Sequence, residues 1–187
     1  KQEVYFASKY DLCGMLEVLK ANLISNKKIH HINKNKIEAS GFLIGPFTAD
    51  EIVTHLEENQ NPIILTVKEE ERVVGYLISY ALNQVNEKLY QEFTNFPEIN
   101  NIEDKSKILY YRQIAKLPGK ENIGTKLIEK MLSEAKKLGY EMIVCRIVHE
   151  PFCNKISIGF HTKFGFKLLG EVQNNNNIKL GIYFNKL

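Results

Sequence analysis

Cysteine is scarce in this sequence, and its spacing suggests neither cross-links nor a cysteine metal site. Three cysteines occur among 187 residues, and no two of them form a CxxC pair. An odd, unpaired set of this kind does not indicate a disulfide framework or a zinc site. Apolar surroundings typical of reduced thiols in a cytoplasmic protein are found around all three, Cys13, Cys145 and Cys153.

Long apolar runs and an excess of one charge are missing as well. No stretch approaches the roughly 20 apolar residues that a membrane span needs, and residues 1–12 contain no apolar signal-peptide core. Lysine and arginine number 25 and aspartate and glutamate 22, with no basic block. We therefore expect a cytoplasmic protein that binds neither membrane nor nucleic acid. Because His30, His31 and His55 lack metal-ligand spacing with cysteine or acid, we expect no metal either.

What is present fits one globular domain over residues 1–187. The hydrophobic fraction of 44% and the charged fraction of 25% are ordinary for such a domain. Strands are expected at residues 3–7, 63–67, 73–82, 142–148, 167–172 and 178–184 and at the start of 108–138, and helices after Ser8, from Thr48, and at 123–138 and 154–164. Residues 26–40 are predicted to form a loop. The order implies an α/β fold, a central mixed sheet with helices on both faces, one β-α-β unit and a final hairpin.

The most informative segment is 108–138, which is predicted to form a strand, a short turn and an amphipathic helix. The turn contains Gly119, Asn122 and Gly124. It should aim unpaired backbone N–H groups and the positive end of the helix dipole at one point, which is a place for phosphate. The turn nearly matches a P-loop, but Thr125 precedes Lys126, so the lysine would point away from the phosphates.

The same turn resembles the cofactor loop of the GNAT superfamily of N-acetyltransferases, [RQ]xxGx[GA]. Gly124 matches the final glycine, while Asn122 replaces the first glycine and Gly119 the leading arginine or glutamine. Asparagine is the non-glycine residue best able to hold a positive φ, and it can also cap the helix. Lys120 is placed to compensate for the missing arginine.

A second motif strengthens the resemblance. Residues 154–166, NKISIGFHTKFGF, are similar to the family's N-x-x-[SA]-x-x-[FL]-[YH]-x-K-x-G-F motif, which also follows the fifth strand. The run at 41–45, the helix from Thr48 and the hairpin at 72–76 look like the family's N-terminal half. The resemblance therefore covers nearly the whole chain.

The resemblance implies a GNAT-like, mostly antiparallel sheet of about seven strands that splays between the fourth and fifth strands to hold acetyl-CoA. The pantetheine arm would pair along the fourth strand, a backbone N–H there would polarise the thioester, and the pyrophosphate would lie on the amides of the turn. The implied cofactor contacts are Ile114, Ala115, Lys116, Lys120, Glu121, Asn122, Ile123, Gly124, Thr125, Asn154, Ser157 and Phe160.

The resemblance also implies direct transfer of the acetyl group to an amine, with no acyl-enzyme. His161 is expected to protonate the departing thiolate, with a pKa near neutrality. Tyr111 should face the same cleft, and Glu150, with His149, could relay a proton from the amine.

The acceptor is left open between a small amine, a polyamine, an amino acid and a protein N-terminus. The insertion at residues 83–107 is expected to cover the acceptor cleft. Its acids favour a cationic amine: Glu87, Glu92, Glu98 and Glu103. A homodimer is one expectation. The alternatives are a non-catalytic acyl-CoA-binding module and a nucleotide-binding P-loop protein.

Overall fold

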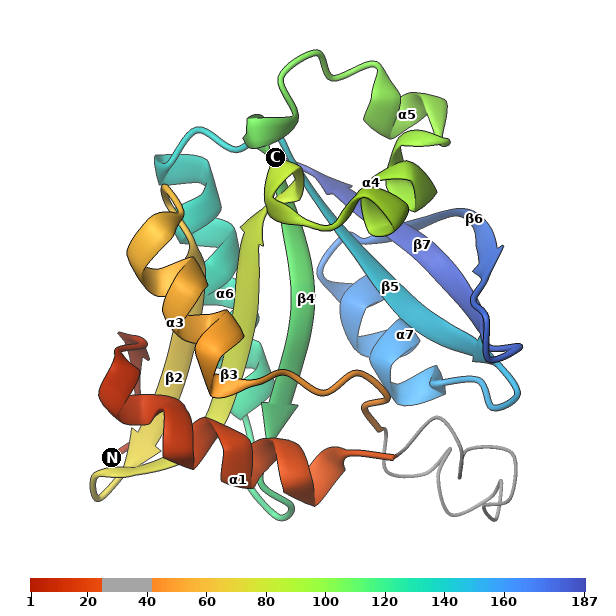
Figure 1. Ribbon diagram of the computed structural model, residues 1–187. Coiled ribbons are helices and arrows are strands. Elements are labelled where there is room, and N and C mark those ends of the chain that lie inside the picture. Colours follow the sequence, from red (N-terminus) through yellow and green to blue (C-terminus); the bar gives the residue numbers. More distant parts are fainter. Residues whose placement is uncertain (25–41) are drawn as a thin grey trace.

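A seven-stranded sheet organises the part of the chain that the computed structural model describes, residues 1–24 and 42–187 (Figure 1). Its strand order is β1-β2-β3-β4-β5-β7-β6. Neighbours run antiparallel except β4 and β5, which are parallel. The strands are β1 (Glu3–Phe6), β2 (Ile63–Glu69), β3 (Arg72–Ala81), β4 (Ile108–Lys116), β5 (Met142–Glu150), β6 (Lys167–Gln173) and β7 (Lys179–Lys186). The predicted mixed, mostly antiparallel sheet is thus confirmed.

Capping boxes start the helices at the two places that the sequence indicates. Ser8 and Asp11 exchange the expected bonds, although they open a 3₁₀ turn (Lys9–Asp11) that leads into the helix. Thr48 and Glu51 do the same at the next helix. The helices are α1 (Leu12–Asn22), α3 (Ala49–Glu58), α4 (Glu87–Thr94), α5 (Pro97–Asn100), α6 (Ile123–Lys137) and α7 (Lys155–Lys163). The predicted loop at 26–40, His30, His31 and the first residue of the 41–45 run lie outside the described residues.

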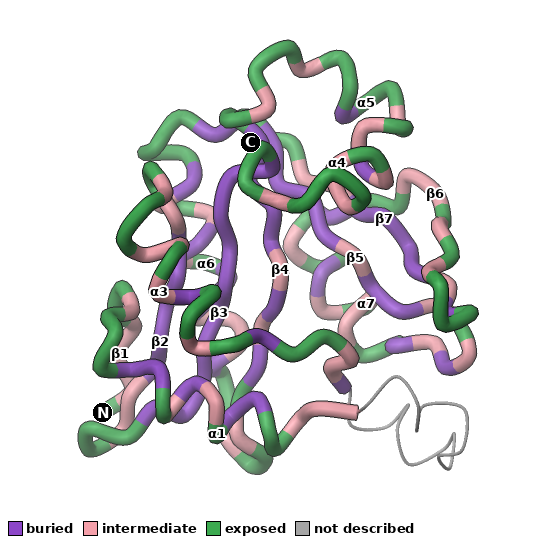
Figure 2. The backbone as a smooth tube through the Cα atoms, in the orientation of Figure 1, coloured by how far each residue is buried: buried purple, intermediate pink, exposed green. Residues whose placement is uncertain are grey.

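The sheet separates two cores. α1 and α3 pack on one face, where Met15 and Ile52 are fully buried. α6 packs on the other, with Leu127 and Met131 fully buried against strand residues such as Ile143. Figures 1 and 2 show this layering, with the central strands buried along nearly their whole length. Alternation of strand side chains between the two cores fixes which residues can reach a site on either face.

The insertion at 83–107 forms two helices instead of an irregular loop. Asn86 caps α4 by accepting from the amide of Leu89, and Pro97 occupies the first turn of α5. Phe93 and Ile99 are fully buried in the core that α1 and α3 also share. This packing holds α4 next to β5, where Glu92 of α4 pairs with Arg146 of β5.

The sheet opens where β4 and β5 stop pairing. They are paired only from Ile108 to Tyr110, against Met142 to Val144. Beyond this point β4 pairs with β3 alone and β5 with β7 alone. Register also shifts in the β3–β4 pairing: Ile78 faces Gln113 and Ser79 faces Tyr111, so Arg112 is an extra residue in β4. The predicted splay between the fourth and fifth strands is confirmed.

Candidate functional site

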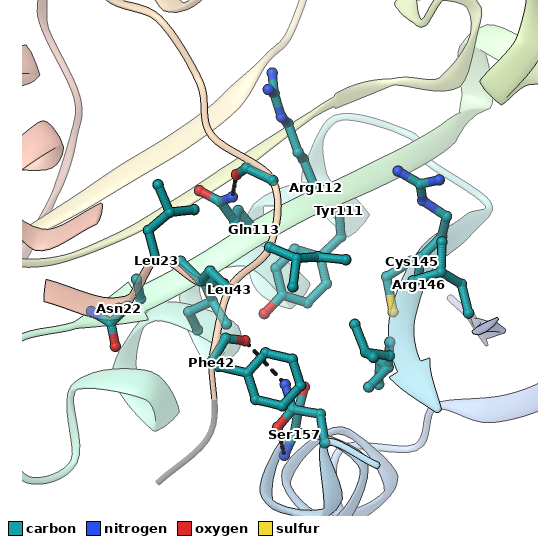
Figure 3. Close-up of a pocket in the computed structure, with 18 of the residues that line it drawn as sticks. Asn22, Leu23, Phe42, Leu43, Tyr111, Arg112, Gln113, Cys145, Arg146 and Ser157 are labelled. Atoms are coloured by element: carbon teal, nitrogen blue, oxygen red, sulfur yellow. Dashed lines mark hydrogen bonds between the residues drawn. The ribbon is translucent and has the colours of Figure 1, made fainter. Parts of the chain in front are cut away.

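A cavity of about 1090 Å³ occupies the splay between β4 and β5 (Figure 3). One end is formed by the open edge of β4, the start of α6 and the inner side of α7. The other end reaches α3, the residues before α4 and the first turn of α4. Of the predicted cofactor contacts, the lining includes Ile114, Ala115, Lys116, Gly124, Asn154, Ser157 and Phe160; of the predicted catalytic residues, it includes Tyr111 and His161.

The start of α6 offers a run of free amides. Asn122 has φ 61° and Gly119 φ 77°, so the turn takes the left-handed conformation that the sequence predicts at Asn122. No residue in the described part of the chain accepts from the backbone N–H groups of residues 121–125. The side chain of Asn122 does not cap the helix, so that expectation is wrong. The helix dipole and these amides together make a site for an anion.

Lysines near this turn are engaged elsewhere. Lys120 pairs with Glu69 at the end of β2, so its expected substitution for the missing arginine finds no support in its position. Lys126 reaches the N-terminal segment, where its Nζ lies 3.2 Å from Oε1 of Gln2. This is the orientation expected from the Thr125–Lys126 order, and it does not fit a P-loop, whose lysine must turn to the phosphates.

Helix α7 forms one wall of the cavity. A Cβ on Gly124 would lie 3.3 Å from the ring of Phe160, so the first turn of α6 approaches α7 closely and tolerates little side chain. Asn154 caps α7 by accepting from the amide of Ser157 at 3.4 Å, and its Nδ2 donates to the carbonyl of Phe42 at 3.1 Å. Both polar atoms of the Asn154 side chain therefore have protein partners.

Residues 42–46 form a crossbar over the splay, tied to both of its sides. At one end Phe42 is held by Asn154 of α7. At the other, Gln113 donates to the carbonyl of Gly45 and Arg112 to that of Pro46, the latter at 3.0 Å. Figure 3 shows the segment passing between the open edge of β4 and α7. The predicted cofactor edge of β4 thus lies behind this crossbar.

Tyr111 and His161 form a buried hydrogen-bonded pair. Nδ1 of His161 lies 2.6 Å from the carbonyl of Ser157, which can only accept, so Nδ1 carries the proton. Nε2 therefore accepts from the hydroxyl of Tyr111, 2.9 Å away. The pair joins α7 to β4 across 50 residues of sequence.

Burial keeps both members of this pair neutral. It lowers the pKa of His161 to about 4, against the hydrogen bond to Ser157, which raises it. It also raises the pKa of Tyr111 well above its usual value. The near-neutral pKa expected of His161 is therefore wrong, because the histidine is only 4% exposed. At neutral pH its imidazole has no extra proton to donate.

Glu150 is placed apart from the cavity. Its carboxylate pairs with Lys179 at 2.9 Å on the surface, and the side chain is 61% exposed. His149 bonds to Glu171 and to the hydroxyl of Tyr183, 3.0 and 2.8 Å away. Neither residue lines the cavity, so the proton relay expected of them is not assembled here.

The far end of the cavity contains side chains for which the sequence predicted no catalytic or binding role. His55 stacks on Tyr80, with ring centroids 3.7 Å apart. Burial, followed by the charge of Arg112, lowers the pKa of His55 below its usual value. Arg112 and Arg146 also line this end. Their one sequence signal is a charge within an otherwise apolar strand.

The acids of the insertion do not face the cavity. Glu92 pairs with Arg146 at 3.0 Å, and Glu87 accepts from Gln91 at 2.8 Å. None of the four acids that suggested a cationic amine, Glu87, Glu92, Glu98 and Glu103, belongs to the lining.

Comparison with known proteins identifies the family. A model of the acetyltransferase (GNAT) family matches residues 35–166. The chain belongs to the GNAT family. No curated protein matches the sequence of this chain. Within the described residues, no helix is long and apolar enough to cross a membrane, and no group of three potential ligands could hold a metal ion.

Solved structures of acetyltransferases share the fold of this chain. An N-acetyltransferase from Staphylococcus aureus Mu50 covers 100% of this chain and 98% of its own, with a TM-score of 0.65 and 21% identity. The YncA protein of Salmonella typhimurium, solved with acetyl-CoA, gives 0.64 and 18%, covering 100% and 94%. PaiA N-acetyltransferase from Thermoplasma acidophilum, solved with coenzyme A, gives 0.61 and 15%, covering 100% and 99%.

Proposed function

We propose that this GNAT protein transfers an acetyl group from acetyl-CoA to an amine by direct attack. The observation that carries the proposal is the run of unpartnered amides at residues 121–125, next to the open edge of β4. The unpartnered amides suit the pyrophosphate of the cofactor. The open edge of β4 suits its extended pantetheine arm, which contains amide groups. The relatives solved with acetyl-CoA and coenzyme A support the same assignment.

The cofactor would lie with its diphosphate on the amides of Glu121, Asn122, Ile123, Gly124 and Thr125. Lys116 adds a positive charge beside this turn, where its Nζ also donates to the carbonyl of Lys120 at 2.6 Å. The arm would run along residues 114–116 toward Tyr111. The carbonyl of Lys116 already accepts from Asn22 at 2.9 Å, so the arm uses the groups before it.

In the reaction, the neutral amine attacks the thioester carbon, a C–N bond forms and the C–S bond breaks. A free N–H of β4 beside the splay stabilises the negative charge that develops on the carbonyl oxygen. The leaving thiolate takes a proton from solvent, because the single O–H of Tyr111 is already donated to Nε2 of His161 and is not available to the sulfur. His161 acts as a positioning residue, because its Nε2 fixes the hydroxyl of Tyr111.

Removal of the amine's proton falls to His55. It lines the acceptor end of the cavity, and its lowered pKa makes it neutral and ready to accept at pH 7. In the structure Nδ2 of Asn59 faces Nδ1 of His55. The proposal requires this side-chain amide to turn over, so that its oxygen accepts from Nδ1 and holds the ring proton there. Nε2 then presents a lone pair to the amine or to a bound water.

Binding and turnover test the proposal separately. Isothermal titration with acetyl-CoA, followed by amide NMR of residues 121–125, should show heat and shifted signals confined to the turn and the β4 edge. Consumption of acetyl-CoA with a panel of amines should then reveal turnover. Well-folded protein that gives neither heat nor shifted signals with CoA or acetyl-CoA would refute the assignment.

A non-catalytic acyl-CoA-binding module is the second candidate. The observation that favours it is the neutrality of the Tyr111–His161 pair, which provides no charged acid beside the sulfur. This candidate predicts the same binding signals with no loss of acetyl-CoA on any amine. Turnover that falls in a Tyr111→Phe variant of unchanged acetyl-CoA affinity would exclude it.

A further inference from the structure

Arg146 projects from β5 into the acceptor end of the cavity with most of its donors unused. Its Nη1 donates to Glu92 of α4 at 3.0 Å. Its Nε and Nη2 have no partner within the described part of the chain. The side chain is 29% exposed, while that of Glu92, behind it, is 16% exposed. Glu92 therefore fixes the guanidinium without occupying the donors that face the cavity.

Charge in the cavity is unbalanced toward the positive. Among the described lining residues, the cations are Arg112, Lys116 and Arg146, and the single carboxylate is that of Glu51. Glu51 is already used twice, since its Oε2 accepts from the amide of Thr48 at 3.0 Å and from Arg112 at 3.3 Å. No cavity-lining carboxylate of the described residues is free to bind the donors of Arg146.

The position of Arg146 separates it from the proposed cofactor site. The parallel register, which pairs Tyr110 with Val144, brings Arg112 and Arg146 to the same level across the splay. Figure 3 shows both guanidinium groups on the side of the strands opposite to the hydroxyl of Tyr111. The cofactor turn begins beyond Lys116, four residues further along β4, which at 3.3 Å per residue is about 13 Å away. The free donors of Arg146 are thus directed to the acceptor.

We propose that the acceptor is an amine that also bears a carboxylate, and that Arg146, supported by the charge of Arg112, binds this carboxylate. This inference rests on the proposed acetyltransferase function. Guanidinium donors in a fixed plane match the two oxygens of a carboxylate. A diamine or polyamine is disfavoured because the one carboxylate of the described lining, that of Glu51, is already paired with Arg112 and does not accept a second cation.

The experiment compares matched acceptors that differ only at the carboxylate. For several side chains, kcat/KM is measured with the amino acid, its carboxamide and its decarboxylated amine, and with a short amidated peptide. The amino acid should be preferred by about 10- to 100-fold over its carboxamide and amine, as expected for bonds between charged groups. Arg146→Gln should remove this preference through KM, so that the amino acid reacts no better than its carboxamide.

Glu92→Gln is the matched control, since it breaks the same ion pair but keeps the guanidinium. If Arg146 served only to hold α4, both variants would lose activity equally on all acceptors, and the proposal would be overturned. Preference of the wild type for the amine, the polyamine spermidine or the amidated peptide would overturn it as well, while leaving acetyl transfer intact. Failure of every acceptor would instead count against the proposed function and, with it, this inference. Thermal melts confirm that both variants are folded.

Discussion

Replacement of His161 by phenylalanine should flatten the acid dependence of the protein's stability. The folded chain holds this histidine neutral, with its pKa lowered from 6.5 to about 4 by burial. Since the unfolded chain binds the proton more readily, the stabilising effect is complete above pH 6.5 and is lost as the pH falls toward 4. Between pH 7 and pH 5 the wild type should lose about 2 kcal/mol of unfolding free energy from this group alone.

The assay is urea unfolding followed by circular dichroism at half-unit steps from pH 7.5 to 4.5. His161→Phe keeps a ring of similar size against Tyr111 and Phe166, whose centroids lie 5.3 and 5.5 Å from that of His161. It also leaves the Tyr111 hydroxyl without its acceptor, so the variant should be less stable at pH 7 by about 1–3 kcal/mol. The decisive quantity is the difference in slope between the two proteins.

Other titrating groups cancel in this comparison. The carboxyls of Glu69 and Glu134, whose pKa values are lowered by hydrogen bonds from Lys120 and from Lys130, respectively, titrate alike in both proteins. A His55→Asn variant serves as the control for the other cavity histidine, whose pKa is also lowered. If wild type and His161→Phe lost the same free energy between pH 7 and 5, the burial argument for His161 would be wrong.

Four further outcomes are expected. Gly124→Val should weaken acetyl-CoA binding by at least tenfold in calorimetry, because the side chain would meet Phe160 at the start of α6. Gly159→Ala, on the open side of α7, should instead raise the unfolding free energy by about 0.5–1 kcal/mol without changing that affinity. Asn122→Ala should cost about 1–2 kcal/mol in urea unfolding, since alanine disfavours φ 61°, whereas Asn122→Gly should be close to neutral. His55→Asn should lower kcat/KM about 100-fold and remove the acid limb of its pH profile, which in the wild type lies below pH 6.5; an unchanged limb would assign the base elsewhere.

Local signals predicted most of the fold. Capping boxes at Ser8 and Thr48 and the turn at Asn122 depend on residues only a few positions apart, and the structure contains all three. The helices of the insertion were missed, although Asn86 and Pro97 are ordinary helix-start residues, because the polar surroundings hid their short apolar faces.

The chemistry of the site depended on contacts that sequence spacing does not encode. His161 becomes neutral because α7 packs onto Tyr111, 50 residues away. Glu150 turns to Lys179 on the neighbouring strand and so leaves the cavity. Arg146 differs in that its charge interrupts an apolar strand, which was a signal of function that could have been used.

The crossbar at residues 42–46 bears on how the two halves of the molecule move. β4 and β5 are paired over three residues each, so the two halves of the sheet on either side of the splay could rotate about this short paired region. Gln113 bonds the crossbar to β4 on one side of the splay, and Asn154 bonds it to the start of α7 on the other. Arg112 adds a second bond on the β4 side, whereas Asn154 supplies the side-chain bond to α7. An Asn154→Ala exchange should therefore loosen the α7 side of the splay and leave the β4–β5 pairing and both cores intact.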